Sequence, residues 1–139
     1  MPVRNAGATL DAALESIAAQ DYAKHELLVW DDGSTDATPE ILRRWLGKEM
    51  PGRVIGNRRV GIGRALALLV GAADSELLAR ADADDINEPH RLSRQAEFLT
   101  EHQKVGVLGA QMRNLETGQA MTDHPTADAD IRWALRFTN

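Results

Sequence analysis

Apolar residues follow two patterns along the chain, one typical of helices and the other of buried strands. Leucine, isoleucine and alanine recur at helical spacing over Ala8–Gln20 and again over Gly61–Ala73, which predicts a helix in each range. Continuous apolar runs of strand length lie at Leu27–Trp30 and within Glu76–Asp82. Because Leu27–Trp30 is apolar throughout and Arg80 is the only charged residue from Leu77 to Ala81, we expect strands that are buried on both faces.

The remaining segments continue this alternation of helices and strands. Thr38 is placed to cap a helix whose first residue is Pro39, and Pro89–Glu101 has the apolar stripe of another helix. The weaker patterns predict short strands at Arg53–Asn57 and Lys104–Met112, a hairpin turn at Thr117–Gly118 and a helix over Ala127–Phe137.

Strands that alternate with helices predict the α/β class, in which a mostly parallel sheet carries helices on both faces. The 139 residues contain no repeat, low-complexity tract or linker, so residues 1–139 are expected to form a single domain. The tryptophans, Trp30, Trp45 and Trp133, fit the packing of a core better than stacking against a sugar.

Composition narrows the classes of function. The net charge of −5 and the isoelectric point near 5.3 argue against a protein that binds nucleic acid through a basic face. The chain has no cysteine, which excludes disulfides and thiolate metal sites and fits a cytoplasmic location. The longest stretch without a polar residue, Ala65–Ala73, is too short to cross a bilayer.

Two clusters of aspartates stand at the ends of the two predicted buried strands. The first cluster is Asp31 and Asp32, and the second is Asp82, Asp84 and Asp85. In open parallel sheets ligands bind at the carboxyl ends of the strands, which is where both clusters are expected. Carboxylates as crowded as those of the second cluster raise one another's pKa unless a cation or strong donors neutralise them. The second cluster therefore predicts a bound positive charge.

Aspartates also cap helices and stabilise turns without binding a ligand. We assign Asp36 to that role, and the same explanation has some force for Asp85, because a helix is expected a few residues later. For Asp82 and Asp84 we favour metal binding, since carboxylate oxygens are the ligands that Mg²⁺ and Mn²⁺ prefer.

A second chemistry also fits a D-x-D pair after a buried strand. Phosphohydrolases of the haloacid dehalogenase type have this arrangement and use the first aspartate, here Asp82, as the nucleophile. They usually continue with threonine or valine where this chain has Ile86. The phosphohydrolase stays open as the alternative function.

Four blocks in the sequence carry a more specific resemblance. The blocks "PVRNAGATLDAALESIAAQDY", "LLVWDDGSTDATPEIL", "NRRVGIGRALALLVGA" and "LLARADADDINEPHRLSRQAEFL" resemble, in this order, consecutive blocks of family 2 glycosyltransferases. The resemblance implies the GT-A fold, a Rossmann-like sheet that binds a nucleotide-sugar. It also implies an inverting, metal-dependent transfer of a sugar to an acceptor hydroxyl, in polysaccharide or glycoconjugate synthesis.

The resemblance also assigns roles to individual residues. The nucleotide-binding residues it implies are Pro2, Val3, Asn5, Asp31, Asp32, Arg64, Asp82 and Asp84. The implied ligands of a Mn²⁺ or Mg²⁺ ion are Asp82, Asp84 and Asp85. Within this set, Asp32 would receive the imide N–H of a uracil-type base, Asn5 would brace the loop at Pro2, and Arg64 would lie beside the diphosphate.

The chain departs from the family pattern in its first loop and at both ends. Arg4 stands where the family usually has a tyrosine. A strand is expected before "PVRN" and an acceptor-binding half after Asn139, so we expect the donor-binding part of an enzyme, truncated at both ends. The catalytic base is unknown, because Asp123, Asp128 and Asp130 match no base motif.

The expected partners follow from this resemblance. They are a nucleotide-sugar donor, with UDP as the expected nucleotide, a glycan or lipid-linked acceptor, and a second copy of the chain that fills the gap in the sheet. Association of the full-length protein with the cytoplasmic face of a membrane is a further expectation. A module that binds a nucleotide-sugar without catalysis is the third hypothesis, since this chain shows no base.

Overall fold

The computed structural model describes the backbone of residues 1–134 and the side chains of residues 1–131. Its contacts divide the chain into two compact units, Met1–His102 and a smaller one that begins at Gln103. That residues 1–139 act as one nucleotide-sugar-binding domain stays a prediction.

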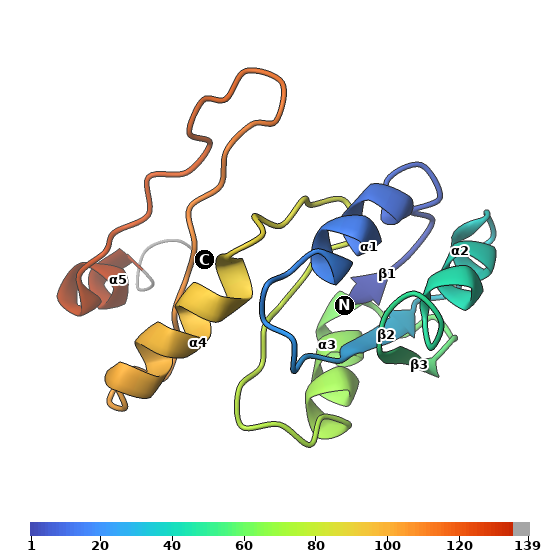
Figure 1. Ribbon diagram of the computed structural model, residues 1–139, viewed down its shortest axis with the longest axis horizontal. Coiled ribbons are helices and arrows are strands. Elements are labelled where there is room, and N and C mark those ends of the chain that lie inside the picture. Colours follow the sequence, from blue (N-terminus) through green and yellow to red (C-terminus); the bar gives the residue numbers. More distant parts are fainter. Residues whose placement is uncertain (135–139) are drawn as a thin grey trace. The chain divides into compact units, whose positions relative to one another are not determined.

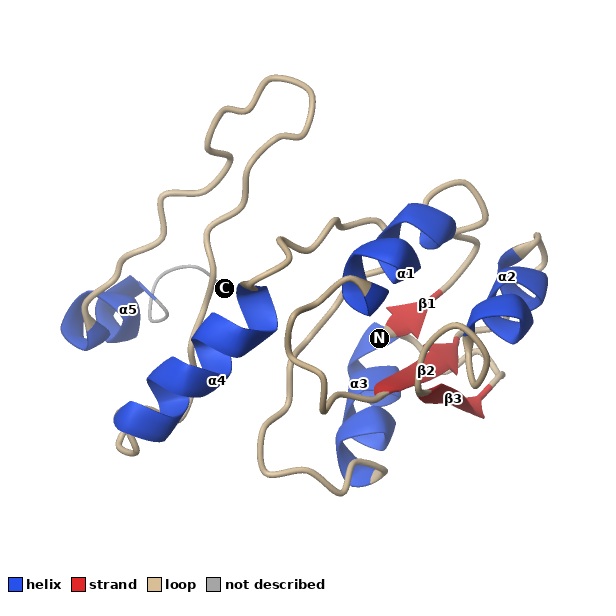
Figure 2. Ribbon diagram, in the orientation of Figure 1, coloured by secondary structure: helices blue, strands red, loops and turns tan. Residues whose placement is uncertain are grey.

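The first unit is built on a parallel sheet of three strands in the order β1-β2-β3 (Figure 2). The strands are β1 (Pro2–Val3), β2 (Leu27–Asp31) and β3 (Gly52–Gly56). Val3 pairs with Asp31, and Val29 pairs with Val54, after which the register shifts before Trp30. The predicted strands at Leu27–Trp30 and Arg53–Asn57 are thus confirmed.

Helices cover both faces of this sheet, as the sequence predicts (Figure 1). The helices of the first unit are α1 (Leu10–Ala18), α2 (Thr38–Trp45), α3 (Ile62–Gly71) and α4 (Arg91–Glu101). Successive residues of β2 point to opposite faces. Leu27 and Val29 pack into a core with α1 and α2, whereas Leu28 and Trp30 pack with Ala65 and Leu69 of α3.

Trp30 shows how tightly the α3 side is packed. The indole is buried, and its N–H donates a hydrogen bond to the carbonyl oxygen of Arg58 at 3.0 Å. The ring lies against Gly56, where an added Cβ would come within 2.4 Å of a ring carbon. The predicted core role of Trp30 is confirmed, and Trp45 is half-buried against the other core. Trp133 lies outside the residues whose side chains are described.

The strand predicted within Glu76–Asp82 is wrong, because this segment is a loop. Leu77 and Leu78 are 45% and 54% exposed. A strand is stabilised by its ladder of hydrogen bonds to a neighbour, and β1, at the edge of the sheet, offers only two residues for such a ladder. The second acidic cluster therefore follows a loop, while the first follows β2 as expected.

In the second unit, the strand predicted at Lys104–Met112 is also wrong. The segment forms no strand, and Val107 is 89% exposed. The predicted hairpin turn is confirmed, although a single antiparallel bridge, between Arg113 and Ala120, takes the place of two paired strands. Gly118, within the turn, has a φ of +67°.

The described part of the second unit contains one helix, near the predicted place. Helix α5 (Asp128–Ala134) covers part of the predicted range Ala127–Phe137, whose last three residues lie outside the described ones. Among all the described helices, none is both long enough and apolar enough to span a bilayer.

Candidate functional site

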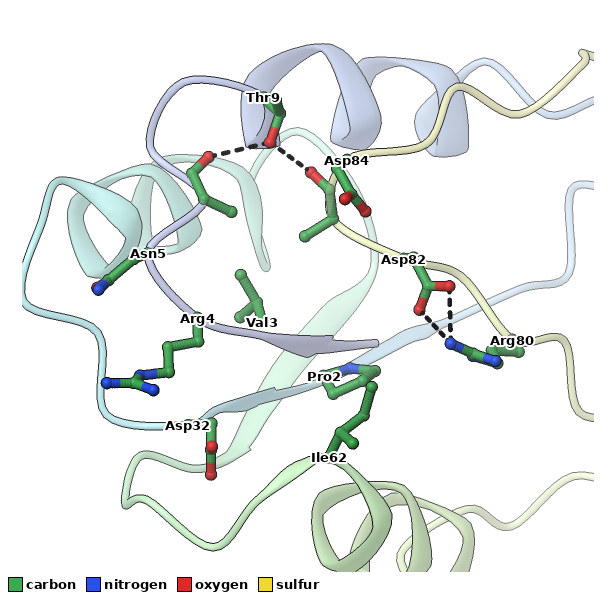
Figure 3. A pocket seen from close by; sticks show the side chains of 12 residues that line it. Pro2, Val3, Arg4, Asn5, Thr9, Asp32, Ile62, Arg80, Asp82 and Asp84 are labelled. Atoms are coloured by element: carbon green, nitrogen blue, oxygen red, sulfur yellow. Dashed lines mark hydrogen bonds and ion pairs between the residues drawn. The ribbon is translucent and has the colours of Figure 1, made fainter. Parts of the chain in front are cut away.

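Four stretches of the chain line one open cleft of about 640 Å³ in the first unit (Figure 3). They are β1 with its following loop (Pro2–Ala6 and Thr9), Asp32 directly after β2, Ile62 at the start of α3, and the loop from Arg80 to Asp84. The volume falls within the range of roughly 300–1,000 Å³ that is typical of small-molecule sites. The cleft is therefore large enough for a nucleotide.

Hydrogen bonds to the loop after β2 fix the loop after β1. Asn5, at a φ of +49°, receives the backbone N–H of Thr35 on its side-chain oxygen at 2.9 Å. Its own N–H donates to the Ser34 hydroxyl at 3.0 Å. The N–H of Ala6 donates to the Thr38 hydroxyl at 2.9 Å. Asparagine tolerates this left-handed backbone better than most residues do, so it suits a loop of this shape.

Asp36 connects the same two loops and has a structural role, as expected. Its two carboxylate oxygens accept the backbone N–H groups of Gly7, at 2.8 Å, and of Thr38, at 3.0 Å. The side-chain hydrogen bond from Thr38, followed by the N–H groups of Gly7 and Thr38, lowers the pKa of the Asp36 carboxyl. The prediction that Thr38 caps α2 is wrong: Ala37 is the N-cap, and the buried Thr38 hydroxyl accepts from Ala6 instead.

Asp32 is held as a carboxylate beside the cleft, although it is only 9% exposed. Its side-chain oxygen Oδ1 accepts the N–H groups of Val60 and Gly61. The N–H of Val60 is the main cause that lowers the pKa of Asp32, with smaller contributions from Gly61 and from the charges of Arg4 and Arg59. Both hydrogen bonds use Oδ1, which leaves Oδ2 as the oxygen for a ligand.

Asp31 lies next to Asp32 but does not line the cleft. It is buried, and its Oδ1 accepts the N–H of Ser34 at 2.8 Å. Asp31 therefore holds the loop whose Ser34 in turn receives the N–H of Asn5.

The loop from Arg80 to Asp84, called the acidic loop below, presents Asp82 and Asp84 to the cleft. Both oxygens of Asp82 lie close to Nη2 of Arg80, at 3.0 and 2.8 Å, as Figure 3 shows. The Asp84 side chain is exposed and has no ion pair within residues 1–131. Asp85 does not line the cleft. Burial lowers the pKa of Arg91, and the charges of Asp85 and Asp82 act against this shift.

The acidic loop is anchored although no strand precedes it. The hydroxyl of Thr9 donates to the carbonyl oxygen of Ala83 at 2.9 Å. Nη2 of Arg91 donates to the carbonyl oxygen of Arg80 at 2.8 Å, and its Nη1 donates to the side chain of Asn87. Hydrogen bonds thus fix this loop from both sides.

Most of the predicted site residues meet at this cleft. Those that line it are Pro2, Val3, Asn5, Asp32, Asp82 and Asp84, while Asp31, Arg64 and Asp85 do not. The lining residues that sequence reasoning did not assign are Ala6, Thr9, Ile62, Arg80 and Ala83, and it named Arg4 only as a departure from the family pattern. Arg80 could have been predicted from the sequence, because it is a charged residue two positions before Asp82 in an otherwise apolar run. No sequence pattern marks Thr9 or Ile62 as a residue of the site.

The carboxylate oxygens that line the cleft are of the kind that binds a hard divalent cation. Among the described residues, no three carboxylate, imidazole or thiol side chains come together to hold a metal. Asp82 and Asp84 nevertheless offer two carboxylates to the same cleft. Carboxylate oxygens fit Mg²⁺ or Mn²⁺, which keeps several positions for phosphate oxygens and water. Two of the three expected metal ligands thus line the cleft, and the assignment of Asp82, Asp84 and Asp85 to a metal stays a prediction.

Two relatives extend beyond the length of this chain. It is 32% identical over 114 residues to EpsE of Bacillus subtilis (strain 168), which is 81% of this chain and 41% of EpsE. It is 26% identical over 133 residues to AmsE of Erwinia amylovora, an amylovoran biosynthesis glycosyltransferase, which is 94% of this chain and 50% of AmsE. The chain thus spans half of these relatives or less.

A solved structure and a family model agree with these relatives. The fold is similar to that of S. aureus TarS 1–349 in complex with UDP, with a TM-score of 0.68 and 28% identity over 73% of this chain and 31% of that one. The model of glycosyl transferase family 2 matches residues 1–138. The chain therefore belongs to glycosyl transferase family 2, and its α/β fold is of the GT-A type.

Proposed function

We propose that the cleft binds a nucleotide-sugar, with UDP as the nucleotide, and that the whole protein transfers the sugar to the hydroxyl of a glycan or lipid-linked acceptor. The observation that carries this proposal is the meeting of the Pro2–Ala6 loop, Asp32 and the acidic loop at one cleft. Membership of family 2 and the similarity to a UDP complex of TarS support it.

The nucleoside end of the donor belongs, in this proposal, between Asp32 and β1. An ionised carboxylate accepts hydrogen bonds and cannot donate them, so Asp32 suits the imide N–H of uracil. Pro2 and Val3 form the wall of the cleft beside it. The low pKa of Asp32 keeps this acceptor charged at neutral pH.

The diphosphate end belongs beside Asp82 and Asp84. A Mn²⁺ or Mg²⁺ ion held by these two side chains would supply a Lewis acid that stabilises the negative charge of the departing nucleoside diphosphate. Asp84, exposed and without an ion pair in the described part of the chain, is the more accessible of the two carboxylates. Asp82 is already paired with Arg80.

The transfer that we propose is a single displacement. The acceptor hydroxyl attacks the anomeric carbon opposite the diphosphate, so the configuration at that carbon inverts. Asp32, Asp82 and Asp84 all have a donor-binding role here, and the base that takes the hydroxyl proton is therefore a further residue of the whole protein. The family match gives the phosphohydrolase alternative no support.

Titration calorimetry of the 139-residue chain with UDP, with and without Mn²⁺, tests the proposal. We expect UDP to bind, Mn²⁺ to tighten the binding, and ADP to bind more weakly. If UDP does not bind in either condition, the proposal fails. Turnover of a phosphomonoester would support the phosphohydrolase instead. Sugar transfer by a longer form of the protein separates an enzyme from a module that only binds the donor.

A further inference from the structure

We infer that Arg80 binds the diphosphate of the nucleotide-sugar, and this inference rests on the proposed function. Arg80 lines the cleft beside Asp82 and Asp84, and its side chain is 59% exposed. The guanidinium is therefore within reach of a ligand in the cleft. The resemblance gave the role beside the diphosphate to Arg64, which is exposed on α3 and does not line the cleft.

The charges in the cleft support this role. Its lining contains the carboxylates of Asp32, Asp82 and Asp84 but only the guanidinium groups of Arg4 and Arg80. The charge of Arg4 acts on Asp32, at the proposed nucleoside end. Arg80 is paired with Asp82, at the proposed diphosphate end. A diphosphate next to two carboxylates needs positive charge, and Arg80 is the guanidinium that the cleft provides at this end.

The hydrogen bonds of Arg80 leave donors for a phosphate. Both contacts to Asp82 use Nη2, so the N–H groups on Nε and Nη1 are not used by this pair. A guanidinium presents its donors in one plane and matches phosphate oxygens in a two-pronged arrangement. Arg80 can therefore keep Asp82 on one edge and receive a phosphate on another.

The position of Arg80 is fixed before any ligand binds. Asp82 holds the guanidinium, and Arg91 holds the backbone through the carbonyl oxygen of Arg80 at 2.8 Å. A side chain that is already oriented loses less conformational entropy when a ligand binds. The ion pair with Asp82 thus orients the phosphate-binding group and also neutralises one of the two carboxylates.

Binding of UDP and of uridine by Arg80→Gln tests the inference, with Arg94→Gln as the matched control, because Arg94 is exposed on α4 and does not line the cleft. Without divalent metal, we expect Arg80→Gln to bind UDP roughly tenfold or more weakly, since a hydrogen bond to a charged group is lost. Uridine, which has no phosphate, should bind both variants like the wild type. Arg94→Gln should bind UDP unchanged. Arg80→Met, which keeps an unbranched stem, replaces Arg80→Gln if the latter does not fold.

The outcomes separate the inference from the proposed function. Unchanged UDP affinity of the Arg80 variant, while the wild type binds UDP, would overturn the role of Arg80 alone. An equal loss of UDP and uridine affinity would also overturn it, because the effect would then come from the shape of the loop. A wild-type chain that binds no UDP, with or without Mn²⁺, would overturn both.

Discussion

The hydroxyl of Thr9 and the carbonyl oxygen of Ala83, 74 positions apart in the sequence, are joined by a hydrogen bond of 2.9 Å. This bond ties the acidic loop to the loop that follows β1. Both loops line the cleft, and neither is held in place by a long strand. The relative position of the two walls of the cleft therefore depends on this hydrogen bond and on the packing of Ala83 into the core beside Val3.

Thr9→Val should loosen the acidic loop while the shape of the side chain is kept. We expect the free energy of unfolding to fall by about 0.5–1.5 kcal/mol, the usual contribution of one hydrogen bond. The Mn²⁺-dependent part of UDP binding should weaken, and uridine binding should change little. Thr100→Val is the matched control, because Thr100 also donates to a backbone carbonyl, but within α4. A loss of UDP affinity in both variants would contradict a specific role of Thr9.

Asp84→Ala and Asp85→Ala should differ sharply in their response to metal. Asp84 lines the cleft and Asp85 does not. We expect Mn²⁺ to tighten UDP binding to the wild type and to Asp85→Ala but not to Asp84→Ala. Neither change removes core volume, so the thermal midpoints should stay close to that of the wild type. If Mn²⁺ tightens UDP binding to neither variant, Asp85 belongs to the metal site as well as Asp84.

Asp32→Ala should weaken the binding of uridine with or without metal. The proposed contact is a hydrogen bond from the base to a carboxylate, so a loss of roughly tenfold or more is expected. Because the low pKa of Asp32 keeps it ionised, uridine affinity of the wild type should be constant from about pH 8 to about pH 5. Unchanged affinity in the variant would remove Asp32 from the site. Unfolding curves show how much stability is lost when Val60 and Gly61 lose their acceptor.

Asp36 should make the first unit sensitive to acid. The pKa of Asp36 is lowered in the folded chain, chiefly by the side chain of Thr38. A lowered pKa means that the stabilisation is fully present above the unfolded value, near about 3.9, and is lost as pH falls through the folded value. The difference in urea midpoint between wild type and Asp36→Asn should therefore be largest near neutral pH and shrink towards acid pH. A difference that stays the same from neutral to acid pH would contradict this role of Asp36.

Sequence patterns predicted those parts of the fold that local chemistry determines. The run Leu27–Trp30 formed a strand with both faces covered, and four amphipathic helices of the first unit formed close to their predicted ranges. The run within Glu76–Asp82 is apolar from Leu77 to Ala81 except for Arg80, but it forms a loop. A strand exists only when a neighbour completes its ladder, and the length of β1 is not visible in the composition of residues 76–82.

The candidate site also has residues that local motifs predict and residues that only contacts between distant segments bring in. Asp32, Asp82 and Asp84 were predicted from their places in the motifs, and they line the cleft. Thr9 joins the site through a contact between distant loops, and such contacts leave no local mark in the sequence. Arg80 was overlooked because its charge was hidden in a run that predicted a strand.

Gly56 and Gly63 should respond in opposite directions to the same added methyl group. At Gly56 a Cβ would lie 2.4 Å from the ring of Trp30, which is buried and held by its hydrogen bond to Arg58. Because the ring cannot move away, Gly56→Ala should lower the free energy of unfolding by about 1–3 kcal/mol, as overpacking does.

Gly63, on the exposed part of α3, has open space where its Cβ would lie. Alanine is the better helix former, so Gly63→Ala should raise the free energy of unfolding by up to about 1 kcal/mol. Urea unfolding of both variants measures the two effects, and a stable Gly56→Ala variant would contradict the close packing of Trp30 against β3.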